Sequence, residues 1–174
     1  RRQRQMCIRD SLKIRLSVYG ENHSRVASVY NDIGEIYSVQ GDDFKALDYF
    51  KKSLKIVLSV YGENHSQVSS IYDHIGEIYF AQKDYSKALY YFEESLKIRL
   101  SLFGENHPEV ALSYYSIGSL YIIQGDKSKA LNYYEKSLKI RLSVYGENHP
   151  LTKEIMDLIN VANSKVLQSP ETTK

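Results

Sequence analysis

The sequence predicts an all-α fold in which antiparallel helix pairs are stacked into a solenoid. The string SLKIRLSVYGENH occupies residues 11–23 and returns unchanged at 137–149, and related strings end at YGENH 61–65 and FGENH 103–107. The spacing is 42 residues each time. This period is typical of solenoids, whose units bury their apolar faces against their neighbours. Apolar residues also recur at three- and four-residue steps within each period, which indicates amphipathic helices.

Each period contains two helices separated by a break. In the first unit a helical pattern over 24–40 ends at Gly41, and Asp42 and Asp43 open a second helix at the positive end of its dipole. Gly62 follows as the C-terminal stop. The same pattern predicts helices near 66–82, 84–102, 108–124 and 126–144, with Pro108 and Pro150 in first turns, where proline is tolerated.

The period divides the chain into three complete units with partial elements at both ends. Residues 11–18 resemble the last turns of a helix without its first half, so we expect this end to be frayed or to expose part of the core. A solenoid end needs an atypical capping element, and residues 150–168 have that character. The predicted organisation is a partial helix and linker at 11–23, units at 24–65, 66–107 and 108–149, a capping helix at 150–168 and a disordered tail at 169–174.

Residues 1–10 do not resemble the repeat. They read RRQRQMCIRD, which aligns with residues 43–52 one period later and matches nowhere. We interpret this arm as a different segment of a longer gene product or as an assembly artefact, and N-terminal sequencing of natively produced protein distinguishes the two. The arm carries a charge of +3, so that the total of +2 leaves −1 for the remaining 164 residues. The array itself is not basic, and we predict no nucleic-acid partner.

Composition and motifs exclude several other classes. A single cysteine, Cys7, allows no internal disulfide, and no apolar run approaches the roughly 18 residues of a membrane span. We therefore expect a soluble cytoplasmic protein without a membrane partner. The sequence contains neither a Gly-rich phosphate loop ending in Lys-Ser or Lys-Thr nor a G-x-S-x-G elbow. These features predict no enzyme activity, no catalytic residue, no metal and no cofactor.

Histidines form the most tempting candidate site. His23, His65, His107 and His149 occupy the same linker of successive units, too far apart to share a metal with bonds of about 2 Å. We predict that they cap or pack the linkers. His74 lies outside this series beside Asp73 and Glu77, but three candidate ligands on one helix are more typical of a solvated face.

The residues of each unit resemble the tetratricopeptide repeat. That family places a large residue, an apolar and a small residue, and an aromatic along its first helix, then an alanine and an aromatic along its second. These roles fall on Tyr30, Ile33, Gly34, Tyr37, Ala46 and Phe50; on Tyr72, Ile75, Gly76, Tyr79, Ala88 and Phe92; and on Tyr114, Ile117, Gly118, Tyr121, Ala130 and Tyr134. The resemblance implies a right-handed superhelical solenoid. Its glycines and alanines mark where two helices approach closely.

Two departures distinguish this array from the common pattern. The usual second-helix alanine is serine here, and the usual terminal proline is leucine; the positions are Ser53, Ser95 and Ser137, and Leu58, Leu100 and Leu142. Without that proline the second helix can continue, which accommodates 42 residues per unit. The array looks most like those of kinesin light chains.

The resemblance implies that first helices line a concave groove that binds a peptide or helical segment of a partner protein. The positions not used for packing are Ser28, Asn31, Asp32, Glu35 and Ser38; Ser70, Asp73, His74, Glu77 and Phe80; and Leu112, Tyr115, Ser116, Ser119 and Ile122. They describe an acidic groove with an apolar end.

Charge indicates the kind of ligand. The first helices total −4 and the second helices +4. A negative groove favours a basic or amphipathic segment. By resemblance, kinesin light chains accept acidic peptides carrying a tryptophan, and some chaperone adaptors clamp a terminal carboxylate with basic residues; neither charge pattern is present here.

Two alternatives stay open beside the peptide-binding scaffold. The first is that the acidic residues of the groove only solvate the concave face. The second is that the array is a structural spacer within a larger protein, or an array that self-associates through an uncapped end at Ser11.

Overall fold

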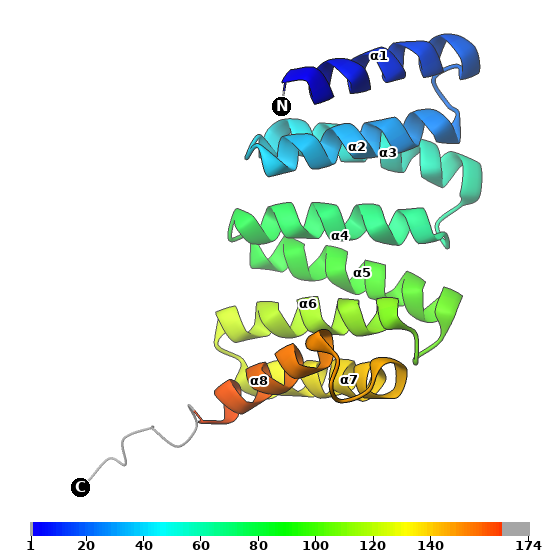
Figure 1. Cartoon of the computed structure of the whole chain (residues 1–174). Coiled ribbons are helices and arrows are strands. Elements are labelled where there is room, and N and C mark those ends of the chain that lie inside the picture. Colours follow the sequence, from blue (N-terminus) through cyan, green and yellow to red (C-terminus); the bar gives the residue numbers. More distant parts are fainter. Residues whose placement is uncertain (1, 165–174) are drawn as a thin grey trace, which may run out of the picture. The chain divides into compact units, whose positions relative to one another are not determined.

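The computed structural model describes the backbone of residues 2–164 and the side chains of residues 10–164. All regular secondary structure in this range is helical (Figure 1). The predicted tail at 169–174 and the end of the predicted cap at 165–168 lie outside the described residues. The helices are α1 (Arg2–Tyr19), α2 (Ser24–Val39), α3 (Asp43–Tyr61), α4 (Ser66–Ala81), α5 (Tyr85–Phe103), α6 (Pro108–Gln124), α7 (Lys127–Tyr145) and α8 (Pro150–Ser164).

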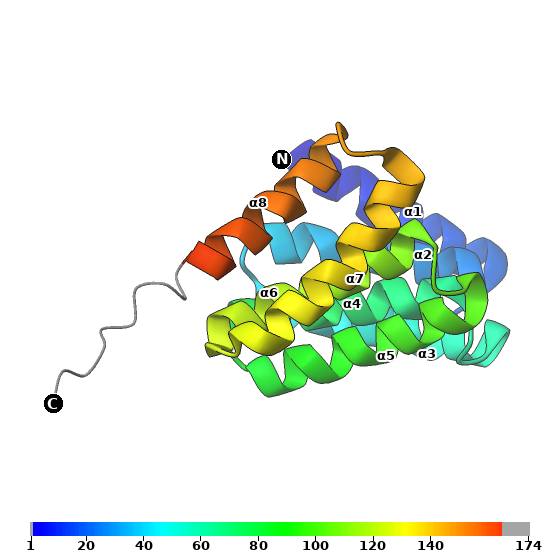
Figure 2. The same cartoon turned by 90° about the horizontal axis from the view of Figure 1, so that it is seen from below.

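The chain forms two compact units that divide at residues 102 and 103. The first unit contains α1 to α5, and the second unit contains α6 to α8. Each of these two units is therefore larger than one 42-residue repeat. Within the first unit, α2 packs against α1 and α3, and α3 packs against α4 (Figures 1 and 2). Within the second, α7 packs against both α6 and α8. The helices lie where the sequence predicts them, and α8 begins at the predicted capping segment.

The first helix differs from the prediction. The sequence indicated only the last turns of a helix from Ser11, whereas α1 runs without interruption from Arg2 to Tyr19. The expectation of a helix without its first half was therefore wrong, because residues 2–10 continue the same helix although they do not resemble the repeat. Leu12 and Leu16 pack against the core of the first unit.

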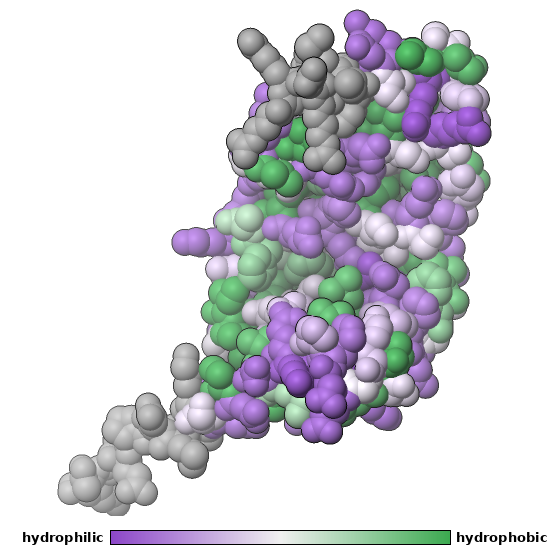
Figure 3. All heavy atoms as spheres, in the orientation of Figure 1, coloured by the Kyte–Doolittle hydropathy of each residue, from purple (hydrophilic) through white to green (hydrophobic). Residues whose placement is uncertain are grey.

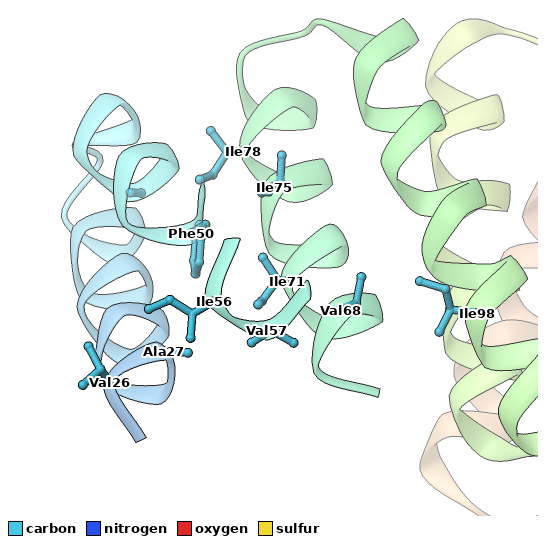
Figure 4. Packing of buried hydrophobic residues seen from close by; sticks show 11 residues of the cluster. Val26, Ala27, Phe50, Ile56, Val57, Val68, Ile71, Ile75, Ile78 and Ile98 are labelled. Carbon is cyan, nitrogen blue, oxygen red and sulfur yellow. The ribbon is translucent and has the colours of Figure 1, made fainter. Parts of the chain in front are cut away.

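The core of the first unit lies between successive helices. Figure 4 shows Phe50 and Val57 of α3 beside Ile71 and Ile75 of α4. All four side chains are at most 2% exposed. Burial of this kind contributes roughly 25 cal/mol per Å² of apolar surface, so these contacts are what hold one helix pair to the next.

A glycine in each first helix packs against an aromatic ring of the second. A Cβ atom added at Gly34 would lie 2.7 Å from Cε1 of Phe50, and one at Gly76 would lie 2.7 Å from Cε1 of Phe92. In the second unit, a Cβ at Gly118 would lie 2.7 Å from Cδ1 of Tyr134. The predicted close approach is confirmed, and the ring is the nearest group at all three positions.

The linker histidines cap helices, as the sequence predicts. Nδ1 of His65 accepts a hydrogen bond from the backbone N–H of Gln67 at 3.2 Å, and the His65 ring stacks on Tyr61 with centroids 4.3 Å apart. The same backbone hydrogen bond and ring contact recur at His23, His107 and His149. Each imidazole thus satisfies one of the free N–H groups in the first turn of a helix.

Gly76→Leu is expected to destabilise the first unit, because a side chain at this position overlaps the Phe92 ring. Overpacking of this kind costs about 1–3 kcal/mol. Thermal unfolding followed by circular dichroism measures the loss as a lowered Tm. Lys51→Leu on the exposed face of α3 is the matched control and should leave Tm nearly unchanged. Equal melting curves for Gly76→Leu and the wild type would contradict this packing.

Candidate functional site

Four of the predicted groove residues line one pocket in the first unit. Ser28, Asn31 and Asp32 contribute from α2, and Ser70 contributes from α4. The pocket has a volume of about 120 Å³. The sequence analysis missed the rest of its lining, which is Ser53 and Val57 of α3 and Gln67 and Ile71 of α4.

The pocket has an exposed rim and a buried floor. Asp32 of α2 and Ser70 of α4 are exposed and both line the pocket. Ser53 and Val57 are 1% exposed, so α3 forms the floor. Figure 3 shows hydrophilic and hydrophobic residues interspersed on the visible face of α4, rather than one apolar patch.

A cluster of ionisable residues lies next to the pocket. Asn31 Nδ2 donates a hydrogen bond to Glu35 Oε1 at 2.6 Å, and His74 Nε2 lies 3.9 Å from the same oxygen. Burial raises the pKa of Glu35, and the nearby Asp32 carboxylate raises that pKa further. Burial also raises the pKa of Glu77, with added repulsion from Asp73 and Glu35. These carboxylates therefore lie close enough to repel one another.

The burial of His74 disfavours its charged form. Its ring contacts Phe50 with centroids 5.0 Å apart, and burial lowers the pKa of the imidazole. Among the side chains described, no three His, Cys, Asp or Glu residues are grouped as metal ligands.

Asp73 is engaged within the protein rather than offered to a ligand. Its Oδ2 lies 2.6 Å from Nη2 of Arg99, and the side chains are 19% and 5% exposed respectively. The sequence analysis counted Asp73 among the acids of the groove, but Arg99 compensates its charge. The remaining carboxylates of this group are Asp32, Glu35 and Glu77.

Tyr115 in the second unit, like Asp73, has partners within the protein. Its hydroxyl donates to Glu154 Oε1 at 2.9 Å, and the guanidinium of Arg141 lies 4.9 Å from the centre of its ring. Leu112 and Ile122 on the same helix are 45% and 37% exposed. The second unit therefore presents the apolar residues that the sequence predicts.

The other predicted positions have local partners or are partly exposed. Phe80 contacts Tyr85 with ring centroids 5.9 Å apart, and Ser119 accepts from the Tyr134 hydroxyl at 3.2 Å. Ser38 and Ser116 are partly buried. The structure therefore brings together Ser28, Asn31, Asp32 and Ser70 at one pocket, and Glu35, His74 and Glu77 at the neighbouring cluster.

A second pocket of about 340 Å³ lies beside α5. Its lining includes Glu63, Tyr72, Tyr90 and Lys97 and so carries charges of both signs. Glu94 also lines this pocket, so two carboxylates and one lysine are found in its lining. Within residues 2–164, none of the helices combines the length and the apolar character that crossing a membrane requires.

Comparisons with known proteins identify what this arrangement resembles. A family model described as Tetratricopeptide repeat matches residues 25–101 and 67–143. Among solved structures, the chain is similar to BtubC (BKLC) from P. vanneervenii, with a TM-score of 0.78 and 19% identity over 99% of this chain and 77% of that one.

Two further structures have the same architecture. A putative kinesin light chain with nearly identical TPR-like repeats from Podosopora anserina gives a TM-score of 0.69 and 14% identity, covering 93% of this chain and 86% of that one. The N-terminal domain of stress-induced protein-1 from C. elegans gives 0.60 and 17%, covering 80% and 96%. At these identities the similarity concerns the fold. No curated protein gives a significant match.

Arg99→Met is expected to destabilise the first unit, because it leaves the Asp73 carboxylate without its buried counter-ion. Removing one partner of a buried pair costs on the order of 3 kcal/mol. Adding Asp73→Asn to the same chain should recover much of that loss, since it also removes the Asp73 charge. Urea unfolding of the two variants measures the difference. Equal stabilities for the single and double variants would show that the pair does not couple.

Glu77→Gln is expected to raise Tm at neutral pH. The raised pKa of Glu77 means that folding disfavours its charged form, so the charged carboxylate lowers stability above that pKa. As pH falls through the raised pKa towards the ordinary value of 4.5, the wild-type side chain becomes neutral and the advantage of the variant should vanish. Melting curves at several pH values test this, with Glu93→Gln on the exposed face of α5 as control. A constant difference between Glu77→Gln and wild type would contradict it.

Proposed function

Since this chain belongs to the tetratricopeptide repeat family and has its all-α solenoid fold, we propose that it is a non-catalytic scaffold that binds a basic or amphipathic segment of a partner protein. Protein interaction is the general role of this fold. The proposed binding surface lies on α2 and α4 of the first unit, which carry the acidic residues. In the second unit, α6 carries the apolar residues. The proposed place of action is the cytoplasm.

The carboxylates of α2 and α4 are the observation that carries this proposal. Burial raises the pKa values of Glu35 and Glu77. Repulsion raises them further, from Asp32 on Glu35 and from Asp73 and Glu35 on Glu77. A cationic ligand would relieve this repulsion, and a negative field also speeds its association. An acidic ligand would add to the repulsion.

One observation favours the second candidate, a spacer that extends or self-associates through α1. Ile14 of α1 is 61% exposed, whereas the residues one, two and three periods later are buried: Ile56, Ile98 and Ile140 are 5%, 8% and 4% exposed. A further helix against α1 would cover Ile14 as the other isoleucines are covered. Light scattering against concentration tests this candidate: growing assembly in the wild type that Ile14→Lys abolishes would support it.

Glu35→Lys combined with Glu77→Lys is expected to weaken binding of a basic peptide and to reduce its salt dependence. Both follow from loss of charge attraction, which salt screens. Titration calorimetry at two salt concentrations with a lysine-rich peptide measures both quantities, while circular dichroism checks that helicity is kept.

The control variant is Glu93→Lys combined with Glu135→Lys. It makes the same change in net charge on exposed faces of α5 and α7, outside the proposed surface. This control should bind like the wild type. If both double variants lose the same affinity, the effect belongs to net charge, and the proposed surface is wrong.

A further inference from the structure

The pocket between α2, α3 and α4 lies where other periods of this chain place an arginine of their own. Positions 15, 57, 99 and 141 are equivalent in the 42-residue period, and they are Arg15, Val57, Arg99 and Arg141. Val57, labelled in Figure 4, is the exception, and it lines the floor of the pocket.

Two of the three arginines donate a hydrogen bond to a backbone carbonyl of the next first helix or of α8. Arg15 Nη1 donates to the backbone carbonyl of Arg25 at 2.9 Å, and Arg141 Nη1 donates to that of Leu151 at 2.6 Å. Arg25 follows Arg15 by ten residues, and Leu151 follows Arg141 by ten. Gln67 follows Val57 by ten, so it is the equivalent residue beside the pocket.

Asn31 and Ser70, which also line the pocket, are likewise equivalent to residues that contact an arginine in other repeats. Asp73, which pairs with Arg99, and Tyr115, whose ring lies under Arg141, are one and two periods after Asn31. Glu154, 3.7 Å from Arg141 Nη1, is two periods after Ser70. Asn31, Gln67 and Ser70 therefore occupy the positions that surround a guanidinium elsewhere in this chain, and all three line the pocket.

Two amide oxygens among the residues that line the pocket are unpaired hydrogen-bond acceptors. Within residues 10–164, Oδ1 of Asn31 and Oε1 of Gln67 are buried and have no hydrogen-bond partner. The orientation of the Asn31 amide is set by the Glu35 carboxylate, which accepts from Nδ2 and would repel Oδ1. Leaving such acceptors buried and unpaired is unfavourable, because they have lost their hydrogen bonds to water.

The serine hydroxyls of the pocket also act as hydrogen-bond acceptors for a ligand. Ser28 donates to Ser24 O at 3.2 Å, and Ser70 donates to Ser66 O at 3.1 Å. Ser53 on the floor donates to Ala27 O at 2.8 Å. Each hydroxyl proton is thus directed to a backbone carbonyl, and the oxygen lone pairs are what remain for a ligand. The Asp32 carboxylate at the rim adds negative charge and further acceptor oxygens.

From these contacts we infer that the pocket binds an arginine side chain of the partner, whose guanidinium takes the place that Arg15, Arg99 and Arg141 occupy at the equivalent positions. This inference rests on the proposed function and names the residue that the acidic surface recognises. A guanidinium has five N–H donors and no acceptor, which matches a pocket of acceptors. The volume of about 120 Å³ is several times the roughly 10–15 Å³ that one water needs.

The test uses three synthetic heptapeptides of lysine and alanine, whose one variable central residue is arginine, lysine or citrulline. The arginine peptide should bind about tenfold more tightly than the lysine peptide, because a forked donor reaches acceptors on both walls. Citrulline has nearly the same shape but is neutral and brings a carbonyl oxygen towards the acceptors, so its peptide should bind more weakly than the arginine peptide. Calorimetry gives the affinities, and NMR shifts of the Asn31 and Gln67 side-chain amides locate the site.

Two variants test the pocket itself. Val57→Arg supplies the guanidinium from within the chain, so it should abolish the preference for arginine over lysine and should raise Tm. Gln67→Met removes one acceptor while keeping the side-chain volume, and it should reduce the preference even if Val57→Arg folds poorly. The matched control is Gln124→Met at the exposed end of α6, which should leave the preference unchanged.

The outcomes separate this inference from the proposed function. If all three peptides bind equally and Gln67→Met changes nothing, the arginine pocket is refuted while a basic-peptide surface still stands. If the arginine and lysine peptides both fail to bind, the proposed function and the pocket fail together. Tight binding of the arginine peptide without shifts at Asn31 and Gln67 also overturns the pocket, since another site then reads the arginine.

Discussion

The contact between a glycine and an aromatic ring is the constraint on which each helix pair depends. Phe50 lies against Gly34 so closely that a Cβ atom there would overlap its ring, and Phe92 lies in the same way against Gly76. The same Phe50 ring contacts His74 on the next first helix. One side chain therefore sets the distance between α2 and α3 and supports the residues that α4 presents beside the acidic cluster.

The repeats keep this contact and vary elsewhere. Near-identity of units would favour a spacer, yet the position four residues after the buried serine carries arginine in α5 and α7 and valine in α3. In α5 the arginine compensates Asp73, and in α7 it lies over Tyr115. Valine compensates nothing, and the pocket opens beside it. Variation at this buried position thus changes what the surface above it offers to a ligand.

Most of the fold could be predicted from the sequence, because helix periodicity, glycine stops and histidine caps are local signals that recur in each unit. The length of α1 could not, since residues 2–10 carry no similarity to the repeat and only continue its helix. The engagement of Asp73 was missed for a different reason. Its partner Arg99 is 26 residues away on another helix, and no local pattern joins the two. Aligning Val57 with Arg99 and Arg141 was the available signal for the pocket.

The acidic cluster and the pocket have the same physical character, which is a deficit of positive charge and of donors. Glu35 and Glu77 lie close enough to repel, and burial makes their charged forms still less favourable. Asn31 joins the two features, because its amide nitrogen binds Glu35 while its oxygen faces the pocket unpaired. Both features lower the stability of the free protein, and such costs are characteristic of binding surfaces. A ligand that supplies a cation and several donors would relieve both at once, which is why we propose that the two form one recognition surface.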